Sequence, residues 1–136
     1  MRYDAVIFDL LTALIDSWTL WNDVAGSADA GLRWRRRYLE ITYGCGPYRA
    51  YETLVCEAAR DVGLPESLGK VLEQRWGELK PWPEAQRVLA RIPVPLAVAT
   101  NCSVRLGRQA ADGVGAPFKV VVTAESAGFY KPRPEP

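Results

Sequence analysis

The stretch Ala5-Val6-Ile7-Phe8-Asp9 places four apolar residues directly before a carboxylate, and two later stretches also place a short apolar run before a polar residue. Leu96-Ala97-Val98-Ala99 precedes Thr100 and Asn101, and Val120-Val121-Val122 precedes Thr123. Short apolar runs without alternation, rich in β-branched residues, are typical of strands that are buried on both faces of a parallel sheet. The three runs therefore predict a parallel sheet with both faces covered.

Helical patterns separate these runs. Residues 104–113 predict a helix with Ser103 as its N-cap and with Gly113 and Gly115 at its end. Residues 83–91 predict a second helix that leads into the middle strand. Strands that alternate with helices indicate an α/β fold with a doubly wound, Rossmann-like parallel sheet. We expect residues 1–16 and 81–136 to form this core domain.

Residues 17–80 contain no strand-like run and predict a helical cap inserted after the first strand. Glycines divide the segment, and its apolar residues recur at intervals of three and four, which is typical of amphipathic helices. The recurring positions, apolar apart from Thr42, are Trp34, Tyr38, Ile41 and Thr42, and then Tyr51, Leu54, Val55, Ala58 and Val62.

The composition excludes several kinds of catalytic site. The 136 residues carry a formal net charge of +1 and no histidine, so Ser-His-Asp sites, Cys-His sites and His-ligated zinc are excluded. The near-neutral charge gives no general attraction to nucleic acid or to anionic membranes. The three cysteines form no C-x-x-C pair, so we expect reduced, mostly buried thiols in a cytoplasmic protein.

Polar side chains follow each predicted strand. Asp9 ends the first strand, Thr100 and Asn101 end the second, and Lys131 lies after the third. In open α/β sheets, ligands bind at the carboxyl ends of the strands, so these groups converge on one edge. A carboxylate nucleophile needs a cation nearby, and hydroxyl and amide groups orient an anionic substrate. The sequence therefore predicts a catalytic site for a small anion.

Four motifs carry a resemblance to a known family. Phe8-Asp9-Leu10-Leu11-Thr12-Ala13-Leu14, Thr100-Asn101 and Tyr130-Lys131-Pro132 resemble the first three motifs of the haloacid dehalogenase superfamily. Within it, the segment from Trp34 to Thr42 resembles the cap helix of the L-2-haloacid dehalogenases. The motifs span nearly the whole chain in the order of that family.

The resemblance implies a hydrolase that acts on a small 2-haloalkanoic acid through an ester on Asp9. Arg35 would receive the halide, and Thr100 and Asn101 would bind the substrate carboxylate. Lys131 would keep Asp9 ionised. No cofactor or metal is implied by this branch of the superfamily.

The sequence also departs from the family pattern. Leu11 occupies the position where phosphatases of the superfamily carry a second Asp and dehalogenases usually carry Tyr, and it would contact the substrate. Thr12-Ala13 replaces the usual Gly-Thr, and the acidic fourth motif that directs the hydrolytic water is missing. Two alternatives therefore stay open: a phosphate-ester hydrolase that needs magnesium, and a catalytically silent homologue or fragment that only binds or dimerises.

Three strands make a small sheet, and the first would lie at an open edge. We expect the chain to be incomplete at its C-terminus. Otherwise, a second copy or another chain completes that edge. The expected partners are thus a small anionic substrate and such a chain, with no nucleic acid and no membrane.

Overall fold

A computed structural model describes residues 2–134 of the chain; residues 1 and 135–136 of the predicted core lie outside this range. Three strands form a parallel sheet in the order β1-β4-β5, with β1 (Val6–Phe8) at one edge, β4 (Leu96–Thr100) in the middle and β5 (Phe118–Thr123) at the other edge. Ile7 pairs with Ala97, which in turn pairs with Val120. The predicted α/β fold with a parallel sheet is confirmed.

Helix α6 (Val104–Val114) connects β4 to β5 and packs on one face of the sheet. The side chain of Ser103 caps it by accepting a hydrogen bond from the Leu106 amide, and Gly115 ends it in a left-handed conformation, as predicted. Val98 of β4 is fully buried beneath this helix, together with Leu106 and Val114. Two shorter helices flank the sheet, α5 (Ala85–Leu89) before β4 and α7 (Ala124–Ala127) after β5.

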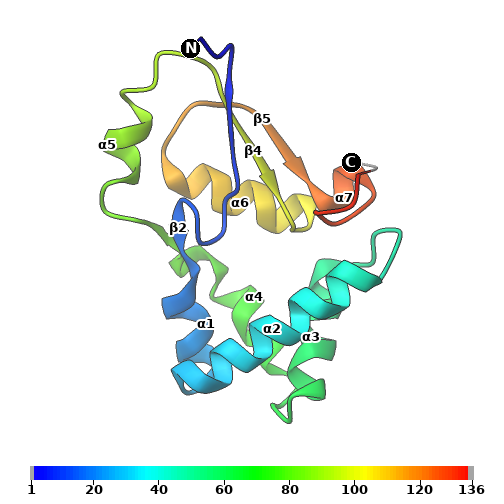
Figure 1. Ribbon diagram of the computed structural model, residues 1–136. Helices are drawn as coiled ribbons and strands as arrows, with labels where there is room; N and C mark the ends of the chain where they lie inside the picture. Colours follow the sequence, from blue (N-terminus) through cyan, green and yellow to red (C-terminus); the bar gives the residue numbers. More distant parts are fainter. Residues whose placement is uncertain (1, 135–136) are drawn as a thin grey trace.

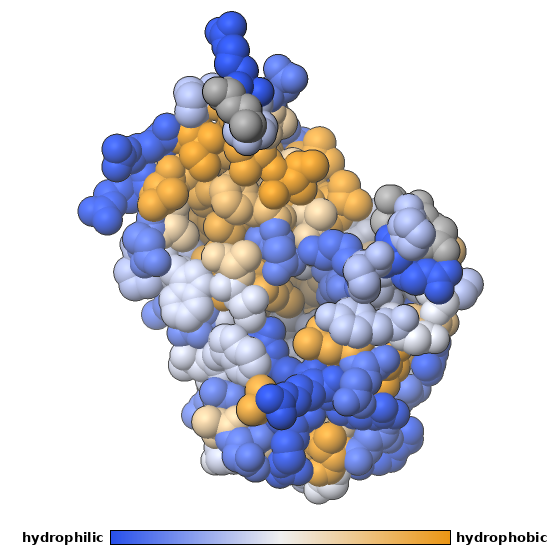
Figure 2. Space-filling view, in the orientation of Figure 1, coloured by the Kyte–Doolittle hydropathy of each residue, from blue (hydrophilic) through white to orange (hydrophobic). Residues whose placement is uncertain are grey.

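The opposite face of the sheet is exposed in the described part of the chain, so the prediction of strands buried on both faces is wrong. Ile7, Val120 and Val122 are 69%, 52% and 39% exposed. Their side chains point to the same side because residues two apart along a strand share a face. Figure 2 shows hydrophobic residues gathered over the part of the molecule where Figure 1 draws the sheet. The sequence runs lack alternation, yet within residues 2–134 a helix covers only one face of the sheet.

Four helices and a 3₁₀ turn follow β1 and lie beyond the carboxyl ends of the strands (Figure 1). Their buried aromatic residues pack together, with the rings of Trp21 and Trp34 centred 4.7 Å apart and those of Tyr38 and Tyr51 5.3 Å apart. The Trp34 indole donates a hydrogen bond to the Val55 carbonyl, which joins two of the helices. The elements are α1 (Ser17–Ala25), α2 (Ala28–Gly44), α3 (Tyr51–Asp61), α4 (Leu68–Gln74) and η1 (Trp76–Glu78).

A two-stranded antiparallel ribbon lies where the chain leaves the sheet for these helices and where it returns. It pairs β2 (Ile15–Asp16) with β3 (Lys80–Pro81), and the prediction of no strand up to residue 80 is wrong at this point. Trp82 strengthens the junction, since its backbone amide donates to the Leu14 carbonyl and its indole to the Thr12 carbonyl. None of the described helices is both long and apolar enough to cross a membrane.

Candidate active site

Asp9 and Lys131 meet at the carboxyl end of the sheet. Lys131 Nζ lies 2.9 Å from Asp9 Oδ1 and also donates to the Ala99 carbonyl at 2.6 Å. The two side chains are 48% and 41% exposed, so solvent screens their attraction, and the pair adds at most about 1 kcal/mol to folding stability. The pair therefore contributes little to stability, and its main effect is to position an ammonium group next to a carboxylate.

Asn101 fixes the backbone from which Lys131 extends. Its Oδ1 accepts a hydrogen bond from the Lys131 amide at 2.7 Å, and its Nδ2 donates to the Lys131 carbonyl at 3.0 Å. The sequence predicts a substrate contact for this amide, whereas the structure commits its oxygen and one N–H to Lys131. Thr100, only 3% exposed, ends β4 beside it and lines the same cavity.

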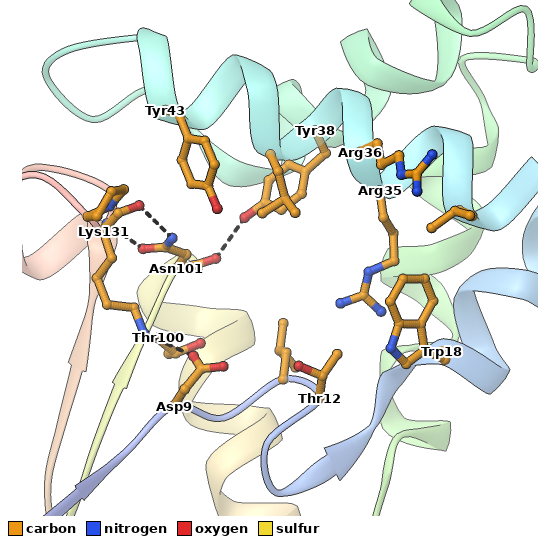
Figure 3. Close-up of a pocket in the computed structure, with 14 residues that line it drawn as sticks. Asp9, Thr12, Trp18, Arg35, Arg36, Tyr38, Tyr43, Thr100, Asn101 and Lys131 are labelled. Carbon is orange, nitrogen blue, oxygen red and sulfur yellow. Dashed lines mark hydrogen bonds and ion pairs between the residues drawn. The ribbon is translucent and has the colours of Figure 1, made fainter.

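Arg35 reaches this cavity from α2. Its Nη1 donates to Ser17 Oγ at 2.9 Å, and its guanidinium lies 4.2 Å above the ring of Trp18. Burial lowers the pKa of Arg35, while the neighbouring tyrosines and the Asp9 carboxylate raise it. Figure 3 shows the guanidinium pointing into the space between the helix and the Asp9 side of the cavity. The structure thus brings Arg35 of α2 and the predicted residues at the sheet edge to one cavity.

The cavity has a volume of about 550 Å³ and lies between the sheet edge and α2. The sheet side supplies the polar groups described above. The helix side supplies residues at intervals of three and four along α2, which place them on one face. The residues that line the whole cavity are Asp9, Leu11, Thr12, Trp18, Leu32, Arg35, Arg36, Tyr38, Leu39, Tyr43, Thr100, Asn101, Lys131 and Pro132.

Tyr38 is a site residue that sequence reasoning placed only in the helical core. It is 7% exposed, and its hydroxyl donates to the Asn101 carbonyl at 3.0 Å. Since Asn101 in turn holds the Lys131 backbone, a continuous chain of hydrogen bonds runs from α2 to the Lys131–Asp9 pair (Figure 3). The spacing of Arg35, Leu39 and Tyr43 on one helix face was the signal that could have shown more of this wall.

The turn after Asp9 contains an unusual backbone conformation. Thr12 has φ of 77°, in the left-handed region, and is the one described non-glycine residue with a positive φ. Its amide donates to the Ile15 carbonyl at 3.0 Å, and its carbonyl accepts the indole of Trp82 at 2.8 Å. These contacts hold the turn, which presents Leu11 to the cavity; Ala13 of the same turn is exposed and does not line it.

The four arginines on α2 were predicted to spread around the helix, with one in the site. Three have fixed partners: Arg33 contacts Asp29, Arg35 contacts Ser17, and Arg37 contacts Asp61 and Glu40. Both Arg35 and Arg36 line the cavity, so the site holds one more arginine than the prediction assigns.

The described residues offer no recognisable metal centre and no activated thiol. Asp9 is the one carboxylate among the residues that line the cavity, and no group of three His, Cys, Asp or Glu side chains gathers within residues 2–134. Cys102 is fully buried next to Asn101, and burial raises the pKa of its thiol, which disfavours the reactive thiolate. Cys45 and Cys56 are free and half-buried.

Comparison with known proteins gives structural matches alone. No protein-family model and no curated protein sequence matches the chain. Its structure is similar to that of the L-2-haloacid dehalogenase from Xanthobacter autotrophicus, with a TM-score of 0.82 and 24% sequence identity over 98% of this chain. A defluorinating L-2-haloacid dehalogenase matches with a TM-score of 0.73 and 22% identity over 96% of this chain.

More distant matches include a candidate phosphoglycolate phosphatase from Lactobacillus plantarum, with a TM-score of 0.61 and 17% identity over 98% of this chain. The chain spans 62% of the length of the Xanthobacter enzyme, 64% of the defluorinating enzyme and 68% of the Lactobacillus protein. The arrangement of the parallel sheet and of the helices beyond its carboxyl edge is thus shared by all three. The chain has the α/β fold of the L-2-haloacid dehalogenases.

Proposed function

We propose that this chain carries the nucleophile and the anion-binding groups of a haloacid dehalogenase-type hydrolase that acts on a small 2-haloalkanoic acid. The observation that carries the proposal is the 2.9 Å contact between Lys131 Nζ and Asp9 Oδ1 in a cavity that Arg35 also lines. A carboxylate with an adjacent cation, facing a second cation across a cavity, suits the displacement of an anionic leaving group.

In the first step, a carboxylate oxygen of Asp9 attacks the carbon that bears the halogen. The carbon–halogen bond breaks as the new carbon–oxygen bond forms, and the halide leaves with the bonding electron pair. Arg35 receives this charge, since its guanidinium is held toward the cavity by Ser17 and Trp18. The Thr100 hydroxyl and the Lys131 ammonium, which both line the cavity, bind the carboxylate of the substrate.

In the second step, water attacks the carbonyl carbon of the Asp9 ester. The 2-hydroxy acid leaves, the Asp9 carboxylate is regenerated and one proton passes to solvent. Asp9 itself is the one carboxylate among the described residues that line the cavity, so none of them serves as a separate base for this water. We therefore expect the 136-residue chain to form the ester faster than it hydrolyses it.

The test is to incubate the chain with 2-chloropropionate and to measure released chloride together with the intact mass of the protein. We expect chloride release and a covalent adduct that peptide mapping places on Asp9. The Asp9→Asn variant should show neither chloride release nor the adduct. Asp4→Asn, which changes an exposed carboxylate before the opposite end of β1, should behave like the unchanged chain. Equal chloride release by the chain and by Asp9→Asn would contradict the proposal.

The phosphatase-like structural match makes phosphate-ester hydrolysis the second candidate. The cavity does not suit a magnesium ion well, because Mg²⁺ prefers several oxygen ligands and Leu11 presents an apolar side chain next to the one carboxylate. Hydrolysis of an aryl phosphate that depends on added magnesium and is lost in Asp9→Asn would favour this candidate over the dehalogenase.

A further inference from the structure

The cavity carries more positive charge than a simple 2-halo acid neutralises. Among the described residues that line it, Arg35, Arg36 and Lys131 are cations, whereas Asp9 is the one anion. This leaves two positive charges in excess. A substrate with one carboxylate would balance one of them.

Arg36 is the cation of the cavity that forms no hydrogen bond or ion pair with the other described residues, in contrast to the three neighbouring arginines of α2. Its side chain is exposed. It follows Arg35 directly in the sequence and shares the cavity wall with Leu32 and Leu39. Its guanidinium is therefore available to a ligand.

The volume of the cavity also favours a ligand larger than a three-carbon acid. About 550 Å³ is within the range of sites that hold drug-sized ligands, roughly 300–1,000 Å³, and a three-carbon acid would leave most of it to water. Leu11, Leu32 and Leu39 supply apolar wall between the charged groups. The space and its lining suit a longer carbon chain with charge at both ends.

We infer that the site takes a dicarboxylate, a 2-halo dicarboxylic acid, with Arg36 as the residue that selects the second carboxylate. The inference rests on the proposed function and names its substrate class. Figure 3 shows the Arg35 guanidinium directed into the cavity, whereas that of Arg36 lies beside α2 and is not directed toward Asp9, so the two cations are separated. A ligand with a carboxylate at each end of its carbon chain can contact two separated cations. A single phosphate concentrates its charge around one phosphorus atom and matches this separation less well.

The experiment measures binding and needs no turnover. Isothermal titration calorimetry at low salt compares succinate with succinamate, which has nearly the same shape but one carboxylate fewer. We expect the unchanged chain to bind succinate about fivefold more tightly, as for an exposed ion pair at the upper end of its usual range. Arg36→Gln should abolish this preference and leave the affinity for succinamate unchanged.

A matched variant, Arg108→Gln, controls for net charge, because Arg108 is exposed on α6 and does not line the cavity. It should keep the preference for succinate. Equal affinities of the two acids in the unchanged chain, or loss of the preference in Arg108→Gln, would overturn the inference. Tighter binding of inorganic phosphate than of succinate, insensitive to Arg36→Gln, would overturn it in favour of a phosphate ligand.

Lys131→Gln separates the inference from the proposed function. If both acids bind without preference and both are weakened by this variant, the cavity binds monoanions and only the inference fails. If the variant leaves the affinity for both acids unchanged, the anions bind elsewhere and the proposed function fails as well.

Discussion

Replacement of Thr12 by glycine should stabilise the chain. The φ of 77° places this residue in the left-handed region, which a β-branched side chain disfavours strongly. Threonine remains there because its backbone amide donates to the Ile15 carbonyl and its carbonyl accepts from the Trp82 indole, which holds the turn from both sides. Glycine adopts the same φ without a steric penalty and keeps both hydrogen bonds.

The magnitude follows from two opposing terms. A non-glycine residue in the left-handed region costs about 1–3 kcal/mol, and Thr12 belongs at the middle of this range or above it. Glycine offsets about 0.5–1 kcal/mol of this gain, because a chain with glycine at this position loses more conformational entropy on folding. The net gain in the free energy of unfolding for Thr12→Gly is thus about 1 kcal/mol, with a shift of the urea midpoint of roughly 0.5 M.

Urea denaturation followed by tryptophan fluorescence measures this gain. The control is Ala13→Gly, at the next residue of the same turn, which is exposed and has no positive φ; it should lose about 0.5–1 kcal/mol. Thr12→Ala should fall between the two, since it keeps a Cβ but removes the branch. A loss of stability in Thr12→Gly as large as that in Ala13→Gly would refute the reasoning.

Four further outcomes are expected. Arg35→Ala should lower chloride release from 2-chloropropionate by at least a hundredfold, as removal of an oriented charge costs about 3–4 kcal/mol in a transition state, and a change below twofold would contradict its role. Tyr38→Phe should lower the free energy of unfolding by about 1 kcal/mol in urea, because the Asn101 carbonyl loses its donor. Cys102 should resist alkylation by iodoacetamide at pH 8 in the folded chain and react in urea, because burial raises the pKa of its thiol and keeps it protonated there; labelling of the folded chain would contradict this. Val120→Thr should reduce self-association in sedimentation equilibrium, since it makes the exposed sheet face less apolar, and identical association of the two proteins would show that this face is not involved.

The central geometry of the site could be predicted because it follows from strand direction. Asp9, Thr100 and Asn101 end neighbouring parallel strands, so their approach depends on topology and not on detailed side-chain packing. The same rule placed Lys131 correctly beside Asp9 across 122 positions of sequence. Arg35 was assigned to the site through the family resemblance, since no pattern in the helix itself distinguishes it from its neighbours.

Other features of the fold and the site could not be predicted from the sequence pattern. The β2–β3 pairing involves two residues on each side, too few to show a period, and the indole of Trp82 that supports it bonds to Thr12, 70 positions away in the sequence. The burial of both sheet faces was overestimated, because Val120 and Val122 are apolar whether or not a helix covers them. The hydrogen bond from Tyr38 to Asn101 depends on how α2 lies against the sheet, which spacing along one helix does not determine.

The way Lys131 is held bears on how this sequence can change over time. Its backbone is held by the amide of Asn101, and its ammonium by the main-chain carbonyl of Ala99 as well as by Asp9. A main-chain acceptor is present whichever side chain occupies that position. Mutational drift at residue 99 should therefore leave the amine in place provided the strand persists, whereas position 101 should tolerate almost no replacement.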